Sequence, residues 1–207
     1  MKLKLNYRLL SKLYDLSELL FFCRTSRSPR QALLSYLPDD SVKVLDICAG
    51  TAINGILISE QKTNATVFGI DNSKEMLSVA RKKIVKKKIK SVEMHEMDAI
   101  NLEFADHVFD VVIISLILHE MGKPMAQKTL SEVRRVIKPE GTVLVVEWEQ
   151  PQGLFQKFMF SIIKRLEFQN FEHFLNKDFD QYFKNNGLNI LDVRHCDYTR
   201  IFKLEVS

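Results

Sequence analysis

The sequence predicts an α/β fold in which helices cover a mostly parallel sheet, and three observations lead to this prediction. Residues 42–47 are mainly β-branched and apolar, as in a strand buried on both faces, and they run into small residues and a helical pattern. A second such strand ends at Asp71, and residues 109–118 form an apolar run typical of a sheet centre. The 207 residues, 46% of them hydrophobic, suffice for one core, so we expect a single domain.

The chain ahead of the first strand is expected to be helical. Leucines recur at helical intervals over residues 5–22, and a further helix is predicted over 29–37. The simplest role of these helices is to pack across the sheet edge. In the alternative, they cover the carboxyl ends of the strands as a lid, so that Tyr7, Tyr14 and Arg30 contact a ligand.

Small residues connect the first strand to the next helix. The stretch from Cys48 to Gly55 lets the backbone approach a ligand closely, and the free N–H groups at the start of a helix offer it hydrogen bonds. Asp46 lies in the first strand of this βαβ unit, and Asp71 ends the second. In nucleotide-binding βαβ units, an acid at the end of the second strand lies near the ribose hydroxyls. Together these signals predict a nucleotide-like cofactor, and an ordinary turn is the alternative.

Strand and helix patterns alternate through the middle of the chain. Ser73 occupies the capping position of a helix start. Asp98 is expected to end the third strand, and a solvated turn aspartate is the alternative interpretation of this residue. The expected elements are a helix start at 72–77, a third strand at 92–99, a fourth strand at 109–118, a helix at 124–135, a turn at 138–141 and a fifth strand at 142–148.

After residue 149 the chain changes character. Residues 150–186 are rich in phenylalanine, which indicates core packing; an apolar substrate pocket or a membrane-facing surface is the alternative. Gly187 is expected to end the last helix. Residues 188–194 and 199–206 then predict an antiparallel hairpin that closes the sheet.

The small-residue loop resembles the first motif of the class I S-adenosylmethionine-dependent methyltransferases, in which Leu-Asp is followed by three glycines at alternate positions. Leu45, Asp46 and Gly50 match this motif, whereas Cys48 and Ala52 take the places of the outer glycines. Because both replacements are small, we expect the loop still to close on a ligand. Cys48 cannot adopt a positive φ without an energetic cost.

The resemblance continues along the chain. The Ser-x-x-Met-Leu run that begins at Ser73, the pair Ala80-Arg81 and the Lys-Pro-x-Gly turn at 138–141 are also similar to this family. The resemblance implies a Rossmann-like sheet of seven strands in the order 3-2-1-4-5-7-6, with the last strand antiparallel and helices on both faces. The parts expected within the single domain 1–207 are an N-terminal helical lid (1–38), a cofactor-binding core (39–149), and an aromatic helical segment with the closing hairpin (150–207).

The same resemblance implies S-adenosyl-L-methionine as the cofactor and S-adenosyl-L-homocysteine as its product. Asp71 would accept hydrogen bonds from the ribose hydroxyls, and Asp98, whose carboxylate only accepts, would accept from the adenine amino group. The residues expected to contact the cofactor are Asp46, Cys48, Ala49, Gly50, Asp71, Asn72, Met76, Asp98, Ala99 and Ser115.

Methyl transfer from a sulfonium is an in-line displacement that requires alignment and the exclusion of water, and a phenol acceptor also benefits from a general base. His119, just past the fourth strand, is the candidate base; a surface histidine at a helix start is the alternative. The candidate substrate contacts are Tyr7, Tyr14 and Arg30. The five histidines show no ligand spacing, so we expect no metal.

Motifs missing from the sequence narrow the acceptor. After its fourth strand the chain lacks both the Asn/Asp-Pro-Pro-aromatic motif of DNA amino-methyltransferases and the Pro-Cys of cytosine C5 enzymes, so a nucleic acid is disfavoured. The pair Tyr14-Asp15 instead resembles the ubiquinone- and menaquinone-biosynthesis type of the small-molecule branch. We therefore expect a small apolar or aromatic acceptor. A cofactor-binding protein without activity and an NAD-dependent dehydrogenase are the alternatives.

Much of the positive charge sits in residues 81–90, around a helical apolar stripe. A solvated helix face is the plain interpretation, and contact with an anionic membrane or RNA is the alternative. Three cysteines without paired spacing favour a reduced, cytoplasmic compartment. The sequence contains no long apolar stretch and no secretion signal, so neither a membrane span nor export is expected.

Overall fold

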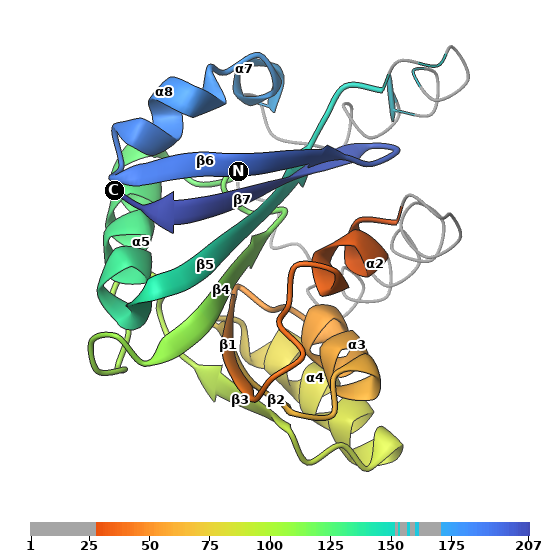
Figure 1. The fold of residues 1–207 in the computed structure, drawn as a ribbon. Coiled ribbons are helices and arrows are strands. Elements are labelled where there is room, and N and C mark those ends of the chain that lie inside the picture. Colours follow the sequence, from red (N-terminus) through yellow and green to blue (C-terminus); the bar gives the residue numbers. More distant parts are fainter. Residues whose placement is uncertain (1–27, 152, 154–156, 158–159, 162–170) are drawn as a thin grey trace, which may run out of the picture.

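The computed structural model of the protein describes residues 28–151, 153, 157, 160–161 and 171–207 (Figure 1). The helices expected over 5–22, and with them Tyr7 and Tyr14, lie outside these residues. Seven strands form one sheet: β1 (Val42–Ile47), β2 (Ala65–Asp71), β3 (Val92–Glu96), β4 (Phe109–Ser115), β5 (Ile137–Trp148), β6 (Leu188–His195) and β7 (Thr199–Val206). The described helices are α2 (Pro29–Leu34), α3 (Ile53–Gln61), α4 (Lys74–Lys87), α5 (Lys123–Val136), α7 (Phe171–Leu175) and α8 (Phe179–Lys184).

The strand order is β3-β2-β1-β4-β5-β7-β6, which confirms the predicted topology. The first five strands pair in parallel, whereas β7 runs antiparallel to both β5 and β6. A parallel sheet collects the carboxyl ends of its strands at one edge, and the connections that leave this edge carry the candidate site.

Helices cover both faces of the sheet (Figure 1). One core packs α2, α3 and α4 against one face, through side chains such as Leu33, Ile58 and Leu77. The other packs α5 and α8 against the opposite face, through Leu130, Val133 and Phe183. None of the described helices is long and apolar enough to cross a bilayer.

Two strands end earlier than the sequence predicts. β3 ends at Glu96, and Asp98 lies in the following loop, where its Oδ1 accepts a hydrogen bond from the Ile100 N–H at 3.1 Å. β4 ends at Ser115 because Leu116 has a φ of 55°, which breaks the extended backbone. The prediction that these strands extend to residues 99 and 118 was therefore wrong.

The turn predicted at 138–141 is an irregularity within β5. Phe109 of β4 lies opposite Ile137, and Val111 lies opposite Thr142, so the extra residues of β5 bulge out between these pairs. At Gly141, a Cβ would lie 2.4 Å from the Ile137 side chain, so only glycine fits there. The bulge brings β5 back into register with β4.

Two helices also end before their predicted positions. α2 ends at Leu34 rather than at residue 37. α8 ends at Lys184, and Gly187, with a φ of 71°, makes the turn into β6 three residues later.

Candidate active site

The loop between β1 and α3 has an unusual backbone. Cys48, Gly50 and Ala52 have φ values of 54°, 55° and 63°, so every second residue is left-handed. This conformation costs an L-residue about 1–2 kcal/mol. Cys48 and Ala52 therefore adopt the backbone expected of the glycines that they replace. The cost predicted for Cys48 is present, and Ala52 carries it as well.

Asp71, at the end of β2, connects this loop to the start of α4. Its Oδ2 accepts a hydrogen bond from the Gly50 N–H at 2.8 Å, and its Oδ1 accepts one from the Ser73 N–H at 2.8 Å. Burial raises the pKa of Asp71, and the N–H groups of Ser73, Gly50 and Asn72 oppose this shift. The carboxylate thus fixes the loop conformation while its remaining lone pairs stay available to a ligand.

Asp46 is buried under the same loop. Its Oδ1 accepts a hydrogen bond from the Asn54 side-chain amide at 3.2 Å, and this amide also donates to the Ser115 hydroxyl at 3.1 Å. The guanidinium of Arg30 donates to the Asn54 carbonyl oxygen. Burial raises the pKa of Asp46 to about 6. Asn54 therefore links Arg30, Asp46 and Ser115, three predicted site residues that come from distant parts of the sequence.

The Cys48 thiol lies among carboxylates. Burial raises its pKa to about 12, and the charges of Asp71, Asp46, Glu120 and Asp98 add to this shift. Asp98 itself is exposed, as is Asn72, whereas Met76 is half-buried and Ala99 is buried. The acids at the ends of β1 and β2 and after β3 thus act on one sulfur atom.

The loop leaves room for a ligand. A Cβ placed on Gly50 would meet no atom within 4 Å, so the space over this residue is open. Within the described part of the chain, the buried Oδ2 of Asp46 has no hydrogen-bond partner. An open loop with acceptor oxygens beneath and beside it fits a ligand that donates hydrogen bonds, such as a ribose.

His119 is buried, with 6% of its surface exposed, and it lies before α5 rather than at its start. The interpretation of His119 as a surface residue is therefore wrong. Its ring packs edge-on against Phe171 and Phe174, with ring centres 5.5 and 6.1 Å away. A buried imidazole needs a hydrogen-bond partner, and strand β5 supplies one.

That partner is Glu147 of β5, which the sequence reading missed. Its side chain is fully buried, and its Oε2 lies 2.8 Å from the Nδ1 of His119. Its Oε1 accepts hydrogen bonds from the N–H groups of Ile117 and Leu118, at 3.2 and 2.8 Å. One carboxylate thus holds both the loop after β4 and the imidazole on that loop. A lone acid inside the apolar run Val143–Trp148 was the available signal.

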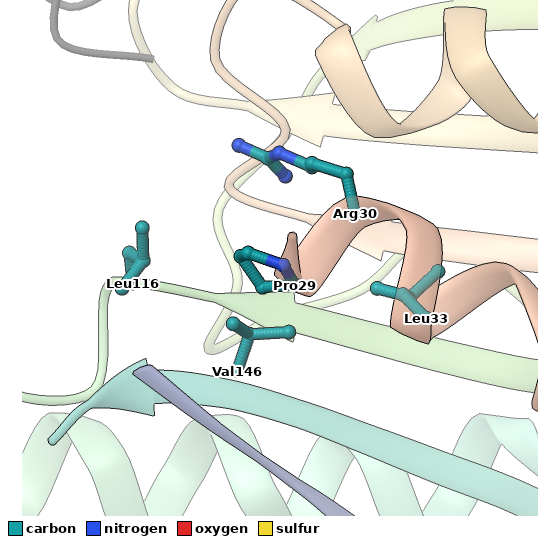
Figure 2. Close-up of a pocket in the computed structure, with 5 residues that line it drawn as sticks. All are labelled: Pro29, Arg30, Leu33, Leu116 and Val146. Atoms are coloured by element: carbon teal, nitrogen blue, oxygen red, sulfur yellow. The ribbon is translucent and has the colours of Figure 1, made fainter. Parts of the chain in front are cut away.

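Arg30 lies on α2, next to a narrow apolar slot between this helix and the ends of β4 and β5. Figure 2 shows Pro29 and Leu33 of α2 over Val146, with Leu116 on the far side. Arg30 also lines this slot, and its guanidinium donates a hydrogen bond to the side-chain oxygen of Asn54. Arg30 therefore belongs to the polar chain under the loop.

A larger groove lies beside His119, between the start of α5 and helices α7 and α8. Its volume is about 1100 Å³, and Met121, Phe174 and Tyr182 contribute to its lining. Among residues 28–151 and the described positions that follow, no group of three or more His, Cys, Asp or Glu could hold a metal ion.

Comparison with known proteins extends the sequence resemblance. A model of the methyltransferase domain family matches residues 38–192. A demethylmenaquinone methyltransferase of Lactobacillus johnsonii is 34% identical over 140 residues, which are 67% of this chain and 56% of that protein. One of Bacillus velezensis is 37% identical over 114 residues, 55% of this chain and 48% of that protein. The match thus spans only about half the length of these relatives.

Solved structures share the fold at low sequence identity. A SAM dependent methyltransferase from Aquifex aeolicus has a TM-score of 0.75 at 20% identity, covering 99% of this chain and 100% of its own. The [4+2]-cyclase SpnF has a TM-score of 0.64 at 15% identity, covering 96% and 95%. Because these neighbours include a cyclase, the likeness establishes the fold alone. The family match over residues 38–192 goes further, and by it this chain belongs to the methyltransferase domain family.

Proposed function

We propose that this protein binds S-adenosyl-L-methionine over the loop 48–52 and transfers its methyl group to a small molecule. Asp71 holds the ribose hydroxyls, and Asp98 accepts from the adenine amino group. The other proposed cofactor contacts are Asp46, Cys48, Ala49, Gly50, Asn72, Met76, Ala99 and Ser115. The observation that carries this proposal is the hydrogen bond between Asp71 and the Gly50 N–H, beside open space.

When bound, the cofactor would supply a methyl group attached to a positively charged sulfur. The acceptor would attack the carbon of this methyl group from the side opposite the leaving thioether. The chain's own task is to align the acceptor and to keep water out. Buried aromatic side chains next to His119, including Phe171 and Phe174, support the second role.

His119 is the proposed general base. If Nδ1 carries the hydrogen and donates a hydrogen bond to Glu147, Nε2 carries the lone pair that takes a proton from an acceptor hydroxyl. Glu147 then stabilises the imidazolium that forms. Glu147 touches no reacting atom in this scheme, so it is a positioning residue.

The proposed acceptor is a small aromatic or apolar molecule. Its support is the family of the chain, the side chains of Met121, Phe174 and Tyr182 in the lining of the groove beside His119, and the name of the relatives, demethylmenaquinone methyltransferase. Quinone-ring precursors with a free hydroxyl fit the proposed base. The lid role of residues 1–38 and the acceptor contacts of Tyr7 and Tyr14 stay predictions; Arg30 is instead proposed to support the cofactor loop.

We also propose a cytoplasmic location with peripheral contact to an anionic membrane. The support is α4, which exposes Lys82 and Lys86, and its C-cap residue Lys88, together with Val85, which is 75% exposed. An exposed apolar residue among lysines suits the surface of an anionic bilayer.

Calorimetric titration with S-adenosylhomocysteine and with NAD tests the cofactor. We expect saturable binding of S-adenosylhomocysteine and none of NAD, and the reverse preference would favour a dehydrogenase. Incubation with S-adenosylmethionine carrying a labelled methyl group and a metabolite extract tests the transfer. Binding of S-adenosylhomocysteine without any labelled product would favour the inactive alternative.

A further inference from the structure

The groove beside His119 carries two lysines that the proposed methyl transfer does not use. Lys123 stands at the start of α5, and Lys177 lies between α7 and α8. The aromatic side chains of Phe174 and Tyr182 line the same groove. A cationic and aromatic lining next to the proposed base suits a ligand that has both an anionic group and an aromatic or apolar body.

The ammonium of Lys177 rests on aromatic rings. Its Nζ lies 4.9 Å from the centre of the Phe174 ring and 4.2 Å from that of Tyr182. Within the part of the chain that the structure describes, neither Lys177 nor Lys123 forms an ion pair. Burial and the charge of Lys123 lower the pKa of Lys177. A partly buried ammonium without an ion-pair partner binds an incoming anion favourably.

The acids in the groove are already engaged. The Oδ1 of Asp178 accepts the Gln181 N–H at 3.0 Å and so caps α8. The carboxylate of Glu120 also has an interaction partner within the described part of the structure. The charge of Glu147 also reaches Lys177, whose pKa it raises, but the Glu147 carboxylate is hydrogen-bonded to His119. The two lysines are therefore the charged groups left to bind a ligand.

We propose that this groove binds the methyl acceptor and that Lys177, assisted by Lys123, binds a carboxylate or another anionic oxygen group of that acceptor. The inference rests on the methyl transfer proposed above and narrows its substrate class. The rings of Phe174 and Tyr182 contact the body of the acceptor, and its hydroxyl faces His119. The acceptor class is thus a hydroxylated aromatic or apolar molecule with one acidic substituent.

A matched pair of probes tests this inference: 3-hydroxy-2-naphthoate and 2-naphthol, which share a ring and a hydroxyl but differ in the carboxylate. Each is titrated calorimetrically into the full chain saturated with S-adenosylhomocysteine, at low salt. We expect the naphthoate to bind at least about tenfold more tightly than the naphthol, as for a charge-assisted hydrogen bond. Lys177→Gln should remove this preference, and Lys177→Arg should retain it.

Lys128→Gln is the control, because Lys128 is an exposed lysine of α5 that does not line the groove. It should leave the preference unchanged. Equal affinities of the wild type for the two probes, binding of neither, or a preference that survives Lys177→Gln would each overturn the inference. Failure of the proposed function has different signatures, since the wild type would then either not bind S-adenosylhomocysteine or bind it without transferring any labelled methyl group.

Discussion

The imidazole of His119 and the carboxylate of Glu147 form a buried pair, with 2.8 Å between Nδ1 and Oε2. His119 lies in the connection after β4, and Glu147 lies near the end of β5. The two residues meet because β4 and β5 pair in parallel and end at the same edge of the sheet. The fold therefore couples a residue of the connection after β4 to a residue inside β5.

This pair predicts a non-additive loss of activity. His119→Ala should lower kcat by about 10²–10⁴-fold, as expected for the loss of a general base. Glu147→Gln should lower it by a substantial part of that factor because the imidazole loses its orientation. Since both act through one group, the double variant should be no slower than His119→Ala alone. Initial rates with the best acceptor found check this, and losses that multiply would show that the two residues act independently.

Asp71→Ala should weaken the binding of S-adenosylhomocysteine by about 2–3 kcal/mol, because a charged acceptor and its hydrogen bonds are removed. Calorimetry at equal protein concentration measures this change. Asp40→Ala is the matched control, since Asp40 is an exposed acid in the turn before β1. Affinity that is the same in wild type and Asp71→Ala would contradict the ribose assignment.

The raised pKa of Asp46 leads us to expect that the free energy of unfolding depends on pH. Burial raises its pKa from 3.8 to about 6, so the folded state binds more protons than the unfolded state between these pH values. The contribution of Asp46 is therefore lost as the pH rises through this window, by about 3 kcal/mol at most. Urea unfolding should show the wild type losing stability between about pH 4 and pH 7 relative to Asp46→Asn. Parallel stability curves of the two proteins would rule out the shifted pKa.

The exposed face of α4 predicts binding to anionic vesicles. The wild type should co-sediment with vesicles that contain phosphatidylglycerol and not with pure phosphatidylcholine. The double variant Lys82→Glu/Lys86→Glu should weaken this binding by more than about tenfold, at roughly 1 kcal/mol for each lysine. The variant Lys123→Glu/Lys128→Glu makes the same charge change on α5 and should bind as the wild type does. If both double variants bind equally well, α4 is not the contact surface.

The resemblance to the methyltransferases implied the order of the strands, and local sequence patterns predicted most element positions. The run from β1 into the small-residue loop, the acid at the end of β2 and the Ser73 cap are local signals, and each appears where it was predicted. The closing hairpin of β6 and β7 is local as well. Such features depend on neighbouring residues and on periodicity, which a single sequence displays.

The interior of the candidate site depends on contacts between distant residues, so the sequence was less informative there. Glu147 looked like an ordinary strand residue, because its partners His119 and Leu118 belong to another connection. Asn54 looked like part of a turn, although it joins α2 to the end of β4 through Arg30 and Ser115. Pairing across parallel strands decides these contacts, and no local pattern encodes it.

A crystal structure of the protein with S-adenosylhomocysteine is the most direct test of the central claim, that the loop 48–52, Asp71 and Asp98 surround one adenosyl group. We expect the ribose hydroxyls within hydrogen-bond distance of Asp71, the adenine amino group next to Asp98, and the backbone of Gly50 against the ligand. An adenosyl group bound elsewhere, with Asp71 still bonded only to the N–H groups of Gly50 and Ser73, would contradict the account.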